Sequence, residues 1–493
     1  MEPAASVITE PKVLQEPGKL FINGQWVEPS SGESFATINP ATEEPILRVG
    51  KATEREVSLA VEAARRAVDS GPWGEMKPME RGKALFRLAD VVERRGDELA
   101  LAESLDTGKP LQTARTRDLP FAIDMLRYYG GWANKVYGTT LPTDTASLAI
   151  TVNEPVGVVA IITPWNSPLI LSLMKIAPAL AMGNTLIHKP ASWTPLSALK
   201  FAEFCQEAGL PAGVYNVLTG SGEAVGTPMV CHPDVNKVSF TGETVTGKKI
   251  MQNAAGTLKR LSLELGGKSP HIVFADGDLD QAASFAAKGF CLNQGQICWA
   301  GSRLFVEEKV HDQLLEKLLV RVKEDWAVGD PMDPKTKMGP LISRSHLDDV
   351  LGHIATGKKE GAKLVTGGDR PPMKKGYYLN PTVFDQVTND MQIARQEIFG
   401  PVLAVIPFKD FSEVIAKAND SFYGLAAGIW TTDMKKAYRT ARLLKAGSVW
   451  VNTYGALDIM APFGGFKQSG FGREFGQEVL RLYSETKTVW FQM

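Results

Sequence analysis

Apolar residues recur at helical spacing in the first part of the chain. Between Glu54 and Ser70 the apolar positions fall three or four residues apart: Val57, Ala60, Val61, Ala64, Ala67 and Val68. This spacing predicts an amphipathic helix that ends near Gly71-Pro72. Residues 81–107 repeat the pattern and predict two more helices, whereas residues 21–27 predict a hairpin that turns at Asn23-Gly24.

Short apolar runs alternate with helical segments from about residue 148 onward. Residues 156–162 are almost continuously apolar, which is typical of a strand buried on both faces of a parallel sheet. The same alternation predicts further strands at 148–152, 185–190, 214–218 and 237–240, and helices at 172–181 and 194–208. After Gly266-Gly267 it starts again, with candidate strands at 271–274, 302–306, 402–406 and 428–430. The pattern therefore predicts an α/β fold with doubly wound sheets, in which a second α/β unit begins near residue 266.

The C-terminal segment 486–491 is apolar and β-prone, but it has no strand-forming neighbour in sequence. Two partners remain open for it: residues 147–152 of the same chain, or a strand of another subunit.

Composition narrows the class of protein. A chain of 493 residues is too long for one hydrophobic core, so two or three domains are expected. The net charge of −1 argues against nucleic acid or an anionic membrane surface as the main partner. No apolar run approaches the ~18 residues that span a bilayer. Residues 1–19 lack the apolar core of a secretory signal, so we expect a loosely held N-terminal segment and no secretory peptide.

The cysteines and histidines indicate the redox compartment of the protein and whether a metal site is expected. Four cysteines (Cys205, Cys231, Cys291 and Cys298) are too few for a disulfide framework in so long a chain. They predict a reducing, cytoplasmic location. No cysteine or histidine spacing matches a zinc site, so no metal is expected.

Two residues stand out as chemical groups. Cys298 lies in Asn293-Gln294-Gly295-Gln296-Ile297-Cys298-Trp299-Ala300-Gly301, between glycine-punctuated turns. A buried core cysteine is the ordinary alternative, but these flanks favour a loop that enters a helix, whose N-terminus would stabilise a thiolate. Glu264 interrupts an apolar strand pattern; it is either an exposed edge carboxylate or a buried base with a raised pKa. Thiol and carboxylate together suggest covalent catalysis at a carbonyl.

Two loops follow predicted strands at places where α/β sheets bind ligands. Residues 220–226 have the spacing GxGxxxG, one residue longer than the usual dinucleotide fingerprint, and fit either a nucleotide site or a plain glycine-rich turn. Asn166 follows the strand at 156–162, and its amide can donate to an oxyanion together with the Cys298 N–H. An ordinary Asn-Ser-Pro turn is the alternative.

Taken together, these segments resemble the aldehyde dehydrogenase superfamily, in its non-acylating, NAD(P)-dependent branch. The resemblance runs from about Phe21 to Lys487. Its motifs are PWN (164–166), HKP (188–190), GxGxxxG (220–226), FTG (240–242), LELGGKSP (263–270), GQxC (295–298), EIFGPV (397–402) and PFGGFKQSGFGRE (462–474). The fold so implied has a Rossmann-like cofactor domain (1–135 and 156–266), an α/β catalytic domain (267–465) and a small β oligomerisation arm (136–155 and 480–493).

The resemblance also implies roles for single residues. The nucleophile falls on Cys298, the general base on Glu264, the oxyanion donor on Asn166, and a proton relay on Lys175 and Glu474. The cofactor, NAD and/or NADP, would contact Trp165, Lys189, Ser192, Gly222, Gly226, Gly242, Glu243, Glu397 and Phe399. The substrate pocket would be lined by Leu171, Met174, Leu292, Ile297, Trp299, Leu457 and Phe463. These positions are apolar and include no arginine, which favours neutral aliphatic or aromatic aldehydes.

Two departures from the family pattern bear on the cofactor. Ser192 stands where many NAD-preferring members carry a glutamate, so NADP use is plausible beside NAD. Glu243 stands where a small hydroxyl residue is common near the pyrophosphate, and we expect it to turn toward solvent.

Other functions remain open at this stage. A coenzyme A-acylating relative typically lacks a base at the position of Glu264. A Cys-His hydrolase would need a histidine such as His271, and a structural protein would not need Cys298, Glu264 and Asn166 intact. The expected partners are a small-molecule aldehyde and further copies of the chain, as a dimer or tetramer, without nucleic acid or membrane.

Overall fold

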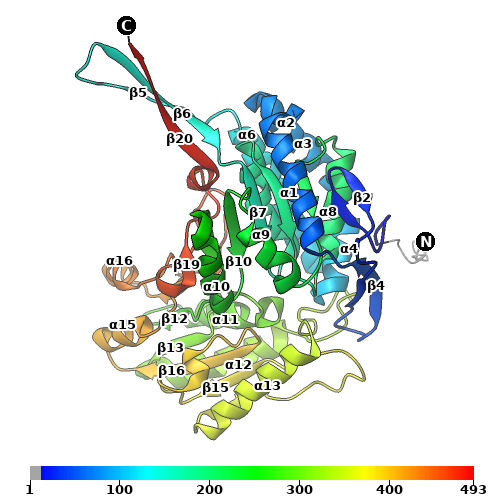
Figure 1. Ribbon diagram of the computed structural model, residues 1–493. Coiled ribbons are helices and arrows are strands. Elements are labelled where there is room, and N and C mark those ends of the chain that lie inside the picture. The colour runs from blue at the N-terminus through cyan, green and yellow to red at the C-terminus, as the bar shows by residue number, and fades with distance from the viewer. Residues whose placement is uncertain (1–12, 493) are drawn as a thin grey trace, which may run out of the picture.

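The first of two large sheets forms the upper part of the body in the computed structural model, which describes residues 13–492 (Figure 1). Its strand order is β19-β11-β10-β7-β8-β9-β1-β2. The bounds are β1 Leu20–Ile22, β2 Gln25–Val27, β7 Val158–Ile162, β8 Thr185–Lys189, β9 Tyr215–Val217, β10 Lys237–Thr241, β11 Arg260–Glu264 and β19 Gly470–Phe471. The strands from β11 to β9 are parallel. Because β7 leads to β8 and β9 on one side and β10 and β11 lie on the other, a crevice is expected at the carboxyl ends of β7 and β10.

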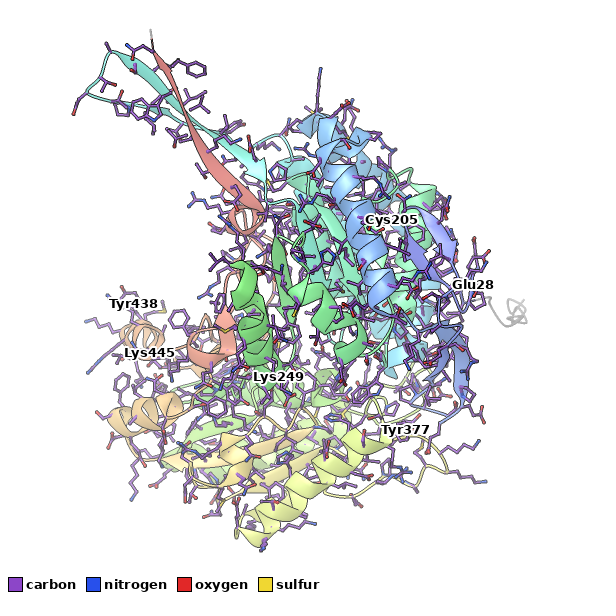
Figure 2. All side chains as sticks on the ribbon, viewed as in Figure 1. Glu28, Cys205, Lys249, Tyr377, Tyr438 and Lys445 are labelled. Atoms are coloured by element: carbon purple, nitrogen blue, oxygen red, sulfur yellow. The ribbon has the colours of Figure 1, made fainter. Side chains whose placement is uncertain are left out.

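Helices cover both faces of this sheet (Figure 1). They are α1 Glu54–Asp69, α2 Pro72–Glu75, α3 Pro78–Arg94, α4 Gly96–Thr107, α5 Leu111–Thr113, α6 Leu119–Trp132, α7 Pro168–Ala181, α8 Leu196–Glu207, α9 Thr227–Cys231 and α10 Thr244–Ala254. The predicted helix at 54–70 is α1, which starts with a capping box between Thr53 and Glu56. Helix α7 begins four residues before the predicted start, because Pro168 suits the first turn of a helix. Cys205 on α8 is buried within this layer (Figure 2).

The second sheet forms the lower part of the body and has the order β14-β15-β16-β13-β12-β17-β18 (Figure 1). The bounds are β12 Pro270–Val273, β13 Arg303–Glu307, β14 Lys363–Thr366, β15 Thr382–Asp385, β16 Val402–Phe408, β17 Ala426–Trp430 and β18 Ser448–Val451. Its helices are α11 Leu279–Cys291, α12 His311–Asp325, α13 Arg344–Lys359, α14 Gln392–Arg395, α15 Phe411–Asn419 and α16 Met434–Leu443. All strand pairs except β14 with β15 are parallel. The four strands predicted here correspond to β12, β13, β16 and β17, and the α/β fold class is confirmed.

A three-stranded sheet projects from the body as an arm (Figure 1). It consists of β5 Thr140–Leu141, β6 Ser147–Pro155 and β20 Ser484–Gln492. Strand β20 pairs antiparallel with β6 along its whole length, from Ser484 opposite Pro155 to Gln492 opposite Ser147. Of the two partners left open by the sequence, the C-terminal strand therefore takes the one in its own chain.

One hairpin was not predicted from the apolar pattern. Strands β3 Ser34–Ile38 and β4 Pro45–Gly50 pair only with each other among the described strands.

Within residues 13–492, no helix is long and apolar enough to cross a membrane, and no cluster of three or more His, Cys, Asp or Glu side chains could hold a metal ion.

Candidate active site

The candidate site lies where the two sheets approach each other. The first sheet contributes segments that follow its strands: Pro164-Trp165-Asn166 after β7, Gly242-Glu243 after β10, and Glu264 at the end of β11. The second sheet contributes segments that precede its strands: Cys298 before β13, and residues 397–399 before β16. The carboxyl edge of one sheet is thus closed by the amino edge of the other.

Two cavities meet at Cys298. The larger has a volume of about 700 Å³ and the smaller about 210 Å³. Cys298, Asn166 and Leu171 line both of them. A ligand in either cavity can therefore approach the same thiol.

The larger cavity contains five of the nine residues predicted to contact a cofactor. These are Trp165, Gly242, Glu243, Glu397 and Phe399. The other four, Lys189, Ser192, Gly222 and Gly226, do not line it. The Ser192 hydroxyl donates a hydrogen bond to the Gly220 carbonyl oxygen at 2.8 Å, which joins the loop after β8 to the glycine-rich loop. Glu243 is exposed, as expected, but it also forms part of the cavity wall.

Aromatic side chains form one wall of the larger cavity. The Trp165 ring packs edge-on against Phe399 and His346, with ring centroids 5.2 Å away in both cases. Phe399 has a φ of 56°, a left-handed conformation that strains a residue with a side chain. His346 Nε2 donates to the Phe399 carbonyl oxygen at 2.8 Å and holds this conformation. His346 comes from α13, and no local motif in the sequence indicated it.

Glu397 lies close to the backbone that leads into β12. Its carboxylate accepts a hydrogen bond from the Gly267 N–H at 3.0 Å. A Cβ atom at Gly266 would lie 2.1 Å from Glu397 Oε2, so only glycine allows this approach. Burial raises the pKa of Glu397 to about 7.

The loop that carries Cys298 is strained and held by long-range hydrogen bonds. Asn293, Gln294 and Gly295 all have positive φ values of 51°, 59° and 70°. Gln294 Nε2 donates to the Pro340 carbonyl oxygen at 2.9 Å. The Ile342 N–H donates to the side chain of Gln296 at 3.0 Å. These contacts explain how three successive left-handed residues persist.

Cys298 itself does not stand at the start of a helix. It lies in a turn between the short 3₁₀ segment Leu292–Gly295 and β13, so the expected helix N-terminus is absent here. Burial raises the pKa of the thiol, and the Glu397 and Glu264 carboxylates raise it further. The expectation of a helix-stabilised thiolate was wrong.

Asn166 lies next to the thiol and is buried. Its side-chain amide donates to the Gln296 backbone carbonyl oxygen at 2.9 Å. The backbone carbonyl oxygen of Asn166 accepts a hydrogen bond from Asn293 Nδ2 at 2.8 Å. One N–H bond of the amide is thus used to hold the loop. The other is left for a ligand in the cavities that Asn166 lines.

Glu264 lies behind the thiol in a buried cluster of charges. It lines neither cavity, and its Oε2 atom has no hydrogen-bond partner. Burial raises its pKa well above the ordinary value, and Glu474 raises it further, against Lys175. Lys175 Nζ donates to Glu474 Oε1 at 2.5 Å, and both side chains are buried.

Lys237 is a further member of this cluster that the sequence did not single out. It lies at the start of β10 and is buried. Burial lowers its pKa to about 7, although Glu474 opposes that shift. Its Nζ lies 5.2 Å from the centre of the Tyr483 ring.

The smaller cavity is mostly apolar. Of the seven predicted pocket residues, six line it: Leu171, Met174, Ile297, Trp299, Leu457 and Phe463. Leu292 does not, because it starts the 3₁₀ segment and packs into the core. Phe121, Phe475 and Arg117 line the cavity as well. The seven predicted positions include no arginine, but the pocket does, because Arg117 comes from a segment far from the motifs.

His271 is not placed to act as a base for Cys298. It is fully buried, its Nε2 accepts from Trp430 Nε1 at 2.6 Å, and its ring stacks on Tyr454 at 4.5 Å between centroids. Burial lowers its pKa to about 3. These contacts argue against a Cys-His hydrolase.

Comparison with known proteins adds to this geometry. The sequence matches the model of the aldehyde dehydrogenase family over residues 26–489. It is 49% identical to aldehyde dehydrogenase 1A1 of Gallus gallus over 473 residues, which cover 96% of this chain and 92% of that protein. An NAD+ complex of aldehyde dehydrogenase from Bacillus cereus has a TM-score of 0.96 at 47% identity and covers 98% of both chains. A structure of indole-3-acetaldehyde dehydrogenase complexed with NAD+ has a TM-score of 0.95 at 43% identity and covers 97% of both chains.

Proposed function

Because the chain belongs to the aldehyde dehydrogenase family, we propose that it oxidises an aldehyde to a carboxylic acid by covalent catalysis at Cys298. The observation that carries the proposal is the meeting of two cavities at this thiol. One cavity has room and polar groups for a cofactor, and the other is an apolar pocket for a small substrate.

The larger cavity fits a nicotinamide cofactor. Trp165 and Phe399 offer aromatic faces to a planar ring, and the Glu397 carboxylate can accept hydrogen bonds from ribose hydroxyls. NAD+ is the cofactor named for the Bacillus cereus structure and for indole-3-acetaldehyde dehydrogenase. Bound there, NAD or NADP would supply a hydride acceptor. Ser192, which carries no charge to repel a 2′-phosphate, keeps NADP open as an alternative cofactor.

Cys298 and Asn166 perform the first half of the reaction. The Cys298 thiolate adds to the aldehyde carbon and forms a thiohemiacetal. The Asn166 side-chain N–H and the Cys298 backbone N–H stabilise the oxyanion. Loss of hydride from this adduct leaves a thioester on Cys298.

Glu264 performs the second half. As a carboxylate it removes a proton from water, which attacks the thioester and releases the acid. The proton then moves toward Glu474 and Lys175, which lie within electrostatic reach of Glu264.

A coenzyme A-acylating reaction is the alternative in the same family. It would release the acyl group to a thiol rather than to water and would not need a general base. The buried Glu264, with its raised pKa, favours hydrolysis.

We assign residues 1–135 and 156–266 to cofactor binding, 267–465 to catalysis, and 136–155 with 480–493 to an arm that joins subunits in a dimer or tetramer. The projecting β6–β20 ribbon, with Trp490 and Phe491 exposed, supports the last assignment.

A direct test measures NAD(P)H formation with hexanal, for the native protein and for two cysteine variants. Cys298→Ala should abolish oxidation while cofactor binding persists, because no thioester can form. Cys231→Ala is the matched control, because Cys231 is exposed and lines neither cavity. Retention of more than a few per cent of turnover in Cys298→Ala would exclude the proposed nucleophile.

A further inference from the structure

The smaller cavity has one charged side chain in its wall. Among its lining residues Arg117 carries the only charge, and most of the others are aliphatic or aromatic. Arg117 is partly exposed, so its guanidinium borders both the pocket and solvent. An arginine beside apolar walls is unusual, because burying its charge is costly without a partner.

The backbone at Arg117 is also unusual. Residues Ala114–Asp118 form a π-helical turn between α5 and α6. A π turn inserts an extra residue into a helix and often occurs at functional sites. Arg115, in the same turn, points to the surface and bonds Asp97 at 2.8 Å, whereas Arg117 borders the cavity.

The charge of Arg117 is not neutralised by the protein. Within residues 13–492, Arg117 forms no hydrogen bond and no ion pair, although a guanidinium offers five donors. The acidic residues nearby have other partners: Asp118 bonds Lys109, and Asp97 bonds Arg115. Burial lowers the pKa of Lys288, and the charge of nearby Arg117 lowers it further. Among the described residues, Arg117 is therefore a charged group of the pocket wall without an ion-pair partner.

We propose that Arg117 binds the anionic end of the substrate, so that the preferred substrate is an aldehyde that carries a carboxylate at its far end. The inference rests on the proposed function, since it requires the aldehyde group at Cys298. A planar guanidinium binds a carboxylate through two parallel hydrogen bonds. The apolar residues that line the same cavity as Cys298 and Arg117 suit the chain or ring that joins the two ends of such a molecule.

The cavity volume limits the size of this substrate. A cavity of about 150 Å³ holds one benzene ring, and this one measures about 210 Å³. The joining part is therefore a short alkyl chain or a single ring. In the reaction the aldehyde carbon is oxidised to a second carboxylate, and the carboxylate at Arg117 is unchanged.

The test compares matched substrates that differ only at the far end. Hexanal and 6-oxohexanoate form one pair, and 4-methylbenzaldehyde and 4-formylbenzoate form another. For each pair, kcat/KM is measured in the native protein, Arg117→Met, Arg117→Lys and Arg115→Met. Arg115→Met removes a positive charge from the same turn but outside the cavity, so it controls for general electrostatics.

We expect the native protein to prefer the carboxylated member of at least one pair. Arg117→Met should lower that preference by on the order of tenfold or more, because a charge-assisted hydrogen bond is lost. Arg117→Lys should keep part of it, Arg115→Met should keep all of it, and added salt should weaken it at this partly exposed site. A native preference for the neutral aldehyde, or an unchanged ratio in Arg117→Met, would overturn the inference. If the native protein oxidised none of the four aldehydes, that result would instead count against the proposed function.

Discussion

At the scale of single residues, the protonation of two groups controls the proposed chemistry. The pKa of the Cys298 thiol and of the Glu264 carboxyl are both raised, chiefly by burial. The thiol reacts only as a thiolate, and the carboxyl acts as a base only when ionised. Since raised pKa values favour the protonated form of both groups, activity should increase with pH as the two groups ionise.

Glu264→Gln tests the assignment of the base. The amide cannot take a proton from water, so steady-state turnover should fall by on the order of 10²-fold or more. Hydride transfer should survive as a pre-steady-state burst of NAD(P)H. The rise of steady-state activity with pH that comes from ionisation of Glu264 should disappear. Stopped-flow absorbance across the pH range measures both effects. If burst and steady rate fall together, Glu264 also deprotonates Cys298.

Ser192→Glu tests the cofactor preference. A carboxylate there should repel a 2′-phosphate and accept bonds from ribose hydroxyls, which raises the NAD/NADP ratio of kcat/KM by on the order of tenfold. Ser192 now bonds the Gly220 carbonyl, so Ser192→Ala is needed as a control for the loss of that bond. The same ratio in Ser192→Glu and Ser192→Ala would mean that the residue lies away from the ribose.

At the scale of elements, the connection from β11 to β12 sets the position of the nucleophile. A Cβ atom at Gly267 would lie 2.2 Å from the Cys298 carbonyl oxygen, which is backbone and cannot rotate away. Gly267→Ala should therefore displace the Cys298 loop and reduce kcat/KM by on the order of 10²-fold, while the protein stays folded. Gly256→Ala is the matched control, because nothing lies within 4 Å of that position. Rates and thermal unfolding of both variants decide the matter, and full activity in Gly267→Ala would show that the loop tolerates the shift.

At the scale of the whole molecule, the projecting arm is the feature whose role a single chain does not explain. Strand β20 adds nine residues to β6 at the edge of a ribbon that projects from the body (Figure 1). Deleting residues 484–493 should disrupt assembly more than folding, because β20 lies at the edge of the arm, outside the main cores, and its removal leaves the edge of β6 unpaired. Size-exclusion chromatography and circular dichroism of the truncated protein measure the two effects. The variant Trp490→Ser keeps the backbone pairing and should weaken assembly through lost apolar contact alone. An unchanged oligomer in both variants would contradict the assignment of the arm.

The two sheets show how much of the fold the sequence indicates. Helical and alternating spacing placed the hairpin at 21–27, helix α1 and the central strands of both sheets, because these patterns arise between close neighbours in the chain. The β3–β4 hairpin and the early start of α7 were not predicted. The partner of β20 also remained open, because pairing across more than three hundred residues leaves no local pattern.

The residues of the candidate site divide in the same way. The sequence by itself determined the identity of the groups: a thiol at Cys298, a carboxylate at Glu264, an amide at Asn166, each in a recognisable motif. Only the tertiary structure decided their environment, because burial and charge come from segments far apart in sequence. Asn166 reaches the Cys298 loop across 130 residues, at Gln296. Burial by such distant segments also raises the pKa of the Cys298 thiol, where the sequence led us to expect a stabilised thiolate. The fold likewise brings Arg117, which belongs to no motif, to the wall of the substrate pocket.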